Sequence, residues 1–297
     1  MEAWTARPAA AAPAPPAFPP PDALPEALRD PFHYTHHLLG QALQARPPDF
    51  HGRLARLAAD RPLRILSLCS GAARIEAGMA PLAGTATHWT LMDLNESLLR
   101  TAAANFPEGV VPDLIVGDLN TIRDFGVRYD VIMCVSGLHH IVELERVLDF
   151  ISAALADGGE FWSIGEAIGR NGNRLWGRAL DAANACFTPL PARLRRNHHT
   201  GVVDERLPDD DYGSGTFEGI RSQDILPLLT DRLDPVDVYR RNCFLWRLVN
   251  QAYNGNYDMS DPEDVARLQG FVLAELAHFR DGGRPTELHG VFRKRLL

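Results

Sequence analysis

The stretch Ser67-Leu68-Cys69-Ser70-Gly71-Ala72-Ala73-Arg74-Ile75-Glu76 decides the fold of this chain. It continues the short apolar run 63–68, which predicts a buried strand, and leads into residues 74–80, which predict a helix. The small residues between them let the backbone turn sharply and approach a ligand closely, and the helix N-terminus presents free amide groups. This geometry suits a nucleotide-like cofactor. Small residues also occur wherever a helix packs tightly against a strand, so the turn alone does not decide the ligand.

Strands and helices alternate outward from this turn. Further strands are predicted at 87–92, 114–116, 129–135 and 159–164, and the helices between them at 74–80, 96–105 and 144–155. Such alternation predicts a parallel sheet covered by helices on both faces, with right-handed crossovers. Ligands bind at the carboxyl ends of the strands in a sheet of this kind.

The flanking segments complete an α/β, Rossmann-like doubly wound sheet that is mostly parallel, with an antiparallel last strand, N-terminal helices and a lid insertion. Residues 1–30, rich in Ala and Pro, predict a flexible tail. The remaining boundaries are 31–61 for two N-terminal helices, 62–166 for the cofactor-binding core, 167–235 for the lid, and 236–297 for completion of the sheet. In that last part we expect a strand at 236–245, a helix at 262–279 and a strand at 287–293 that forms an antiparallel edge.

Two acids follow successive predicted strands. Asp93 lies about 20 residues after the small-residue turn, where a carboxylate can accept both hydroxyls of a ribose. Asp118 ends the next strand and is placed to receive an exocyclic amino group. Each Asp could instead be a helix N-cap or a turn residue. Because the turn and both acids stand at three successive strand ends, we favour a shared site.

Residues 63–166 resemble the class I S-adenosylmethionine-dependent methyltransferases. The resemblance rests on the turn, on the two acids, on 129–141 as the fourth strand with its loop, and on 155–161 as the turn into the fifth strand. It implies that Gly71 and its neighbours lie against the methionine part of S-adenosylmethionine, that Asp93 binds the ribose and that Asp118 with Leu119 holds the adenine. The residues implied in cofactor binding are Ser67, Cys69, Gly71, Ala72, Asp93, Leu94, Asp118, Leu119, Val135 and Ser136.

The turn departs from the family pattern, which carries an acid and three glycines. This chain has Ser67, Cys69, Gly71 and Ala73 at those positions. Ala and Cys are small enough for the turn if their φ angles stay negative. The missing acid removes a usual partner for the amino end of the cofactor. Weak cofactor binding, or an inert relative that serves as a binding or scaffold protein, therefore stays open.

Methyl transfer is an in-line displacement at a sulfonium, in which the enzyme chiefly aligns donor and acceptor and a base is optional. The candidate catalytic residues are His139 and His140 after the fourth strand and Glu166 after the fifth. Glu166 could equally cap the loop that follows it. No metal is expected. The pair His198-His199 with the Asp triplet 209–211 does not predict one, because adjacent histidines rarely point the same way.

Composition narrows the partners. The formal net charge of −8 argues against nucleic acid and anionic membranes as partners. Four single cysteines, with no paired spacing, and the lack of an apolar run of about 20 residues fit a cytoplasmic protein. The leading hypothesis is methylation of a small molecule, typically of secondary metabolism, at O, N or C, with S-adenosylhomocysteine as product. A nicotinamide-dependent oxidoreductase is the alternative on the same fold, and a homodimer is left open.

Overall fold

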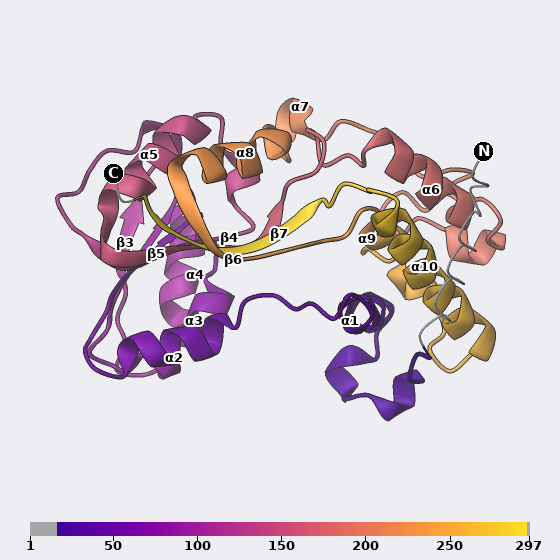
Figure 1. The fold of residues 1–297 in the computed structure, drawn as a ribbon, viewed down its shortest axis with the longest axis horizontal. Helices are drawn as coiled ribbons and strands as arrows, with labels where there is room; N and C mark the ends of the chain where they lie inside the picture. The colour runs from indigo at the N-terminus through magenta and orange to yellow at the C-terminus, as the bar shows by residue number, and fades with distance from the viewer. Residues whose placement is uncertain (1–16, 296–297) are drawn as a thin grey trace, which may run out of the picture.

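The structure, a computed structural model, describes residues 17–295. Seven strands form one sheet in the order β3-β2-β1-β4-β5-β7-β6 (Figure 1). The strands are β1 (Arg64–Leu68), β2 (His88–Asp93), β3 (Asp113–Val116), β4 (Tyr129–Val135), β5 (Leu155–Ala167), β6 (Leu233–Arg241) and β7 (Glu287–Lys294). The first five pair in parallel, and β7 pairs antiparallel with both β5 and β6. The predicted doubly wound, mostly parallel sheet is confirmed.

Ten α-helices accompany the sheet within the described residues. They are α1 (Pro31–Leu43), α2 (Phe50–Ala58), α3 (Arg74–Ala83), α4 (Glu96–Asn105), α5 (Leu144–Ala154), α6 (Gly177–Phe187), α7 (Gly213–Thr216), α8 (Ser222–Arg232), α9 (Leu245–Leu248) and α10 (Pro262–Arg280). Side-chain caps set several of their starts. Asp30 accepts the amides of Phe32 and His33 at the start of α1, and Asn95 accepts those of Ser97 and Leu98 at the start of α4.

The sheet is buried on both faces because its strands alternate apolar side chains between two cores. In β1, Leu66 and Leu68 face the core built with α5 and α8, whereas Ile65 faces the core built with α2, α3 and α4. In β4, Ile132 and Met133 divide in the same way. Near-continuous apolar strands are typical of parallel sheets covered by helices on both sides. The sequence order reverses between β1 and β4, and ligands bind beside such a switch point.

The prediction that the last strand forms the edge of the sheet is wrong, because β6 lies outside β7. Two observations give the reason. β7 carries the buried residues Leu288, Val291 and Phe292. A neighbouring strand on each side of β7 helps to keep these side chains from solvent. β6 is largely exposed and contains Pro235, which has no N–H to donate and is tolerated at a sheet edge.

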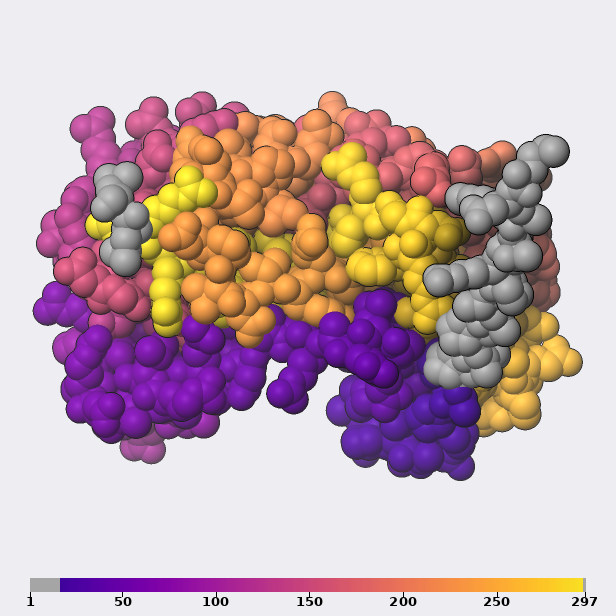
Figure 2. Space-filling view, viewed as in Figure 1, coloured from indigo at the N-terminus to yellow at the C-terminus, as the bar shows by residue number. Residues whose placement is uncertain are grey.

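A third apolar core lies beyond the carboxyl ends of the strands. It joins α1, α6, α9 and α10, which come from three distant parts of the sequence and form a helical layer beside the sheet (Figure 1). The surface is notched between α1 and the pair α2 and α3 (Figure 2). None of the helices in the described range 17–295 is long and apolar enough to cross a membrane.

The predicted tail 1–30 falls partly outside the description, since residues 1–16 are not described. Residues 17–30 contain two short 3-10 turns, Pro21–Ala23 and Glu26–Leu28. Phe18 and Leu24 pack against the third core, and the Tyr34 hydroxyl donates to the carbonyl of Pro19 at 2.8 Å. The packed chain therefore begins before Pro31. The predicted lid 167–235 contains α6, which packs in the third core, and α8, which packs on α5.

Candidate active site

The turn after β1 has a left-handed backbone at three alternate residues. Cys69 has φ +51°, Gly71 has φ +52° and Ala73 has φ +48°. The condition that Cys69 and Ala73 keep negative φ angles is therefore not met. Each non-glycine residue in this region costs roughly 1–2 kcal/mol, and such strain clusters at ligand sites. A Cβ added at Gly71 would meet nothing within 4 Å, so the backbone there borders open space.

Asp93 ties the turn to the end of β2. Its Oδ2 accepts the amide of Gly71 at 2.8 Å, and its Oδ1 accepts the amide of Asn95 at 2.8 Å. A carboxylate offers about four acceptor sites, so each oxygen keeps one free. Asp93 also pairs in the sheet with Val116, and its carbonyl accepts the amide of Gly117. The turn after β1, Asp93 at the end of β2 and the loop that bears Asp118 therefore meet at the carboxyl ends of the strands.

Asp118 begins a short 3-10 helix, Leu119–Thr121, and its Oδ1 accepts both the backbone amide and the side-chain amide of Asn120 at 2.9 Å. It thus serves as an N-cap, one of the two roles that the sequence left open, while its second oxygen makes no hydrogen bond within residues 17–295. The apolar surface between the two acids is uncovered. Leu94 is 71% exposed and Val116 is 55% exposed, whereas Leu119 is buried.

The loop after β4 faces the turn after β1. Ser136, in this loop, also has a left-handed backbone, with φ +48°. The Cys69 thiol lies 3.7 Å from the carbonyl oxygen of Gly137, to which it donates. A Cβ at Gly137 would fall 2.5 Å from the Cβ of Cys69. Glycine is required at position 137 because the two loops approach so closely.

Glu166 holds the loop after β4 in place. Its side chain is 0% exposed and accepts the amides of Gly137, Leu138 and His139, together with Nδ1–H of His139 at 2.6 Å. It therefore caps a loop that precedes it in the sequence. Four charge-assisted hydrogen bonds to one buried carboxylate make this loop a rigid part of the site.

His139 and His140 lie side by side, with ring centroids 4.1 Å apart. Nε2 of His139 is 3.5 Å from Oε1 of Glu218, and Nε2 of His140 is 3.7 Å from Oε2 of the same residue. The premise that adjacent histidines rarely point the same way, applied above to His198 and His199, fails for this pair. Burial lowers the pKa of His139, but hydrogen bonds to Glu166 and Glu218 outweigh it and raise the pKa to about 10.

A buried acid from α3 lies beside Ser67, the position at which the family pattern has an acid. Glu76 is buried, and the Ser67 hydroxyl donates to its Oε1 at 2.6 Å. Burial raises the pKa of Glu76. The sequence showed Ser67 at the position of the family's acid, but it did not show that a carboxyl group from the first turn of α3 would lie beside it.

A cavity of about 330 Å³ opens beside the loop after β4. Separate parts of the chain line it: Ser136 comes from the loop after β4 and Gly165 from β5. Phe32 comes from α1 and Glu218 from the insertion. The other lining residues are His139, Ala167, Gly169, Arg170, Asn173, Arg174, Ser222, Trp246, Thr286 and Glu287. Of the three candidate catalytic residues, His139 is the one that lines this cavity.

Glu218 and Phe32 are site residues that the sequence did not reveal. Glu218 stands in the insertion without any motif around it, and Phe32 belongs to the helical pattern of α1. Only the packing of the insertion and of α1 over the strand ends brings them to the cavity. Arg170 and Arg174, quoted within the insertion, do line the cavity, and they pair with Asp209 and Asp211.

The central part of the chain is similar to known methyltransferases. Residues 65–159 match a family described as methyltransferase domain. No curated protein matches the chain. Similar solved structures include a putative S-adenosylmethionine-dependent methyltransferase from Listeria monocytogenes, at 15% identity and TM-score 0.44, covering 79% of this chain and 92% of that one. Another is the N-methyltransferase NodS from Bradyrhizobium japonicum WM9 with S-adenosyl-L-homocysteine, at 13% identity and TM-score 0.43, covering 88% and 99%.

The matched residues contain the turn at Gly71, the acids Asp93 and Asp118, and the loop after β4. These are the parts that the structure brings together at the carboxyl ends of the strands, beside the switch point of a doubly wound sheet. Residues 65–159 are thus identified as a methyltransferase domain.

Proposed function

We propose that this methyltransferase transfers the methyl group of S-adenosylmethionine to an O, N or C atom of a small polar molecule, typically a secondary metabolite. The observation that carries the proposal is the cavity of about 330 Å³. Ser136 and His139 line it, and both belong to the loop that follows the carboxyl end of β4. The cavity supports an acceptor that reaches the cofactor from the side of α1 and the insertion.

The residues present fit the cofactor. The open space at Gly71 leaves room for the methionine part beside the backbone. Asp93 keeps one free acceptor site on each oxygen for the two ribose hydroxyls, and the exposed side chains of Leu94 and Val116 offer an apolar surface to the adenine. When bound, the cofactor supplies an electrophilic methyl group on a sulfonium. We assign the remaining contacts to Ser67, Cys69, Ala72, Asp118, Leu119, Val135 and Ser136.

Two observations support a small acceptor. Cavities of 300–1,000 Å³ are typical of small-molecule sites. The cavity beside Ser136 adjoins another of about 510 Å³, with which it shares Asn173, Glu218 and Trp246. The walls combine aromatic rings with charged and amide side chains, so they suit an acceptor that has both a ring or chain and polar groups.

The three candidate catalytic residues take different roles in this proposal. Glu166 is a positioning residue, because its buried carboxylate accepts hydrogen bonds from the loop after β4. His139 faces the acceptor and orients it. His140 is exposed, and its Nδ1 lies 3.3 Å from the carbonyl oxygen of Phe217. Alignment of acceptor and methyl group, and exclusion of water by the surrounding helices, supply most of the rate in such a displacement.

Equilibrium binding tests the proposal. The full chain is titrated in parallel with S-adenosylmethionine, S-adenosylhomocysteine and NAD, and methyl transfer from labelled S-adenosylmethionine to fractionated small-molecule extracts is then followed. We expect binding of the first two ligands and label in a small-molecule fraction. Binding of NAD alone would favour an oxidoreductase, and cofactor binding with label only in protein or nucleic acid would contradict the small acceptor.

A further inference from the structure

Three side chains converge on one point of the acceptor cavity. Nε2 of His139, Nε2 of His140 and the carboxylate of Glu218 can each offer one ligand atom, and these atoms lie within 4.8 Å of one another. Nε2 of His139 lies 3.5 Å from Oε1 of Glu218, and Nε2 of His140 lies 3.7 Å from Oε2 of the same carboxylate. Two donors bound tetrahedrally to one ion at about 2.0–2.2 Å are separated by roughly 3.3–3.6 Å. The three donors therefore already stand close to the spacing that a single metal ion imposes.

The other nitrogen of each imidazole is already engaged. Nδ1 of His139 lies 2.6 Å from Oε1 of Glu166, and Nδ1 of His140 lies 3.3 Å from the carbonyl oxygen of Phe217. A carboxylate or a carbonyl on the far nitrogen fixes the tautomer, and it is the usual partner of a histidine that binds a metal. Both Nε2 atoms can thus turn their lone pairs toward Glu218.

The charges favour a cation at this point. Glu166 and Glu218 place two carboxylates on His139, one at each ring nitrogen. Glu166 is fully buried, and hydrogen bonds hold it to the loop, so it cannot move away. A bound ion would replace the proton on Nε2 of His139 and lie between this nitrogen and Glu218.

We propose that His139, His140 and Glu218 bind a divalent ion of the zinc type on the wall of the acceptor cavity. Two imidazoles and one carboxylate form the donor set that suits Zn²⁺, Fe²⁺ or Ni²⁺ and leaves coordination positions open. His139 and Glu218 both line the cavity, so the open positions face it. This step rests on the proposed function: the ion takes an oxygen of the acceptor as a further ligand. The acceptor should therefore carry a hydroxyl or carboxylate group.

Metal titration tests this inference with the full chain. Protein treated with a chelator and then dialysed is titrated with Zn²⁺ alone, and binding is followed by calorimetry and by metal analysis after gel filtration. Co²⁺ then replaces Zn²⁺, and its visible absorption reports the coordination number. We expect one ion per chain. Affinity should fall at least tenfold in His140→Ala and in Glu218→Gln, which both alter partly exposed side chains.

His51→Ala is the matched control, because His51 is an exposed histidine on α2 outside the cluster. It should bind Zn²⁺ as the unaltered chain does. Lack of stoichiometric binding, or equal affinity in His140→Ala, Glu218→Gln and the control, would overturn the metal site. Binding of S-adenosylmethionine is measured in the same samples. Cofactor binding without Zn²⁺ binding contradicts the metal site alone, whereas Zn²⁺ binding without cofactor binding supports the metal site and contradicts the proposed function.

Discussion

The carboxylate of Asp93 accepts the backbone amide of Gly71 at 2.8 Å and so joins the end of β2 to the turn after β1. The residue proposed to bind the ribose therefore also holds the left-handed turn against which the methionine part is expected to lie. Loss of this carboxylate affects two parts of the site at once. It removes two acceptor sites for hydroxyl groups, and it frees the amide of Gly71.

Asp93→Ala should weaken binding of S-adenosylmethionine by about 1–3 kcal/mol, because charge-assisted hydrogen bonds to the ribose are lost. The affinity is measured by calorimetry. Asp157→Ala is the control, since Asp157 is an exposed acid near the start of β5, whereas Asp93 lies at the end of β2. Unchanged affinity in Asp93→Ala would remove the ribose assignment.

Gly71→Ala separates the strain of the turn from its contact with the cofactor. Gly71 and Gly126 both have a positive φ, and a Cβ at either position would meet nothing within 4 Å. Alanine at either position should therefore cost a similar roughly 1–2 kcal/mol of stability. Only Gly71→Ala places a methyl group in the proposed cofactor site. We expect its affinity for S-adenosylmethionine to fall at least tenfold while that of Gly126→Ala stays unchanged. Equal affinities in the two variants would place the cofactor elsewhere.

Much of the fold was predictable because its signals are local. The apolar run 129–135 gave β4, and the helical pattern 96–105 gave α4, both with the observed limits. The position of β7 was not predictable from its own residues. It depends on whether β6 or β7 is better suited to a sheet edge, and this becomes clear only when the burial of both strands and Pro235 are considered together.

The candidate site divides in the same way. Asp93 and Asp118 follow strands, so their positions follow from the sheet. Glu218 reaches the cavity through the tertiary packing of the insertion, which no local pattern encodes. The left-handed backbone of Cys69 and Ala73 also escaped prediction, because local propensity disfavours it and the surrounding loops impose it.

Glu166→Gln should destabilise the protein by about 2–4 kcal/mol. The amide nitrogen would face backbone N–H groups that now donate to a carboxylate oxygen, and a buried donor would be left without an acceptor. The free energy of unfolding is measured in urea. Glu143→Gln, at an exposed acid just before α5, should change it by less than 0.5 kcal/mol. A loss of activity with unchanged stability would instead indicate that Glu166 acts directly on the acceptor.

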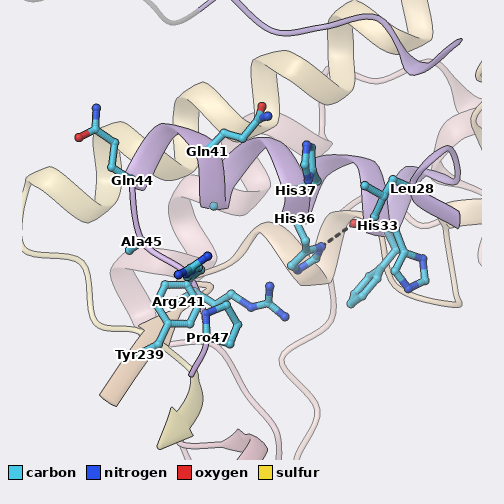
Figure 3. A pocket seen from close by; sticks show the side chains of 13 residues that line it. Leu28, His33, His36, His37, Gln41, Gln44, Ala45, Pro47, Tyr239 and Arg241 are labelled. Carbon is cyan, nitrogen blue, oxygen red and sulfur yellow. Dashed lines mark hydrogen bonds between the residues drawn. The ribbon is translucent and has the colours of Figure 1, made fainter. Parts of the chain in front are cut away.

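His36 should make the stability of the protein fall in mild acid. The imidazole lies on α1 above the strand residues Tyr239 and Arg241, in a cavity of about 630 Å³ (Figure 3). Burial, with Arg241 and His33 as further positive neighbours, outweighs the Phe32 carbonyl and Glu287 and lowers the pKa of His36 to about 4. Its Nε2 makes no hydrogen bond within the described chain, so protonation brings no compensating contact.

The sign of this pH dependence follows from proton binding. Between pH 6.5 and pH 4 the unfolded chain binds the proton at position 36 and the folded chain does not, so stability falls as the pH falls, by roughly 3 kcal/mol in total. Below pH 4 both states are protonated and this contribution stays constant. His36→Gln cannot take up the proton and should lose less stability than the unaltered chain across this range, as measured by urea unfolding at several pH values. His51→Gln, which alters an exposed histidine, should keep the full pH dependence; if His36→Gln keeps it as well, other groups cause the loss.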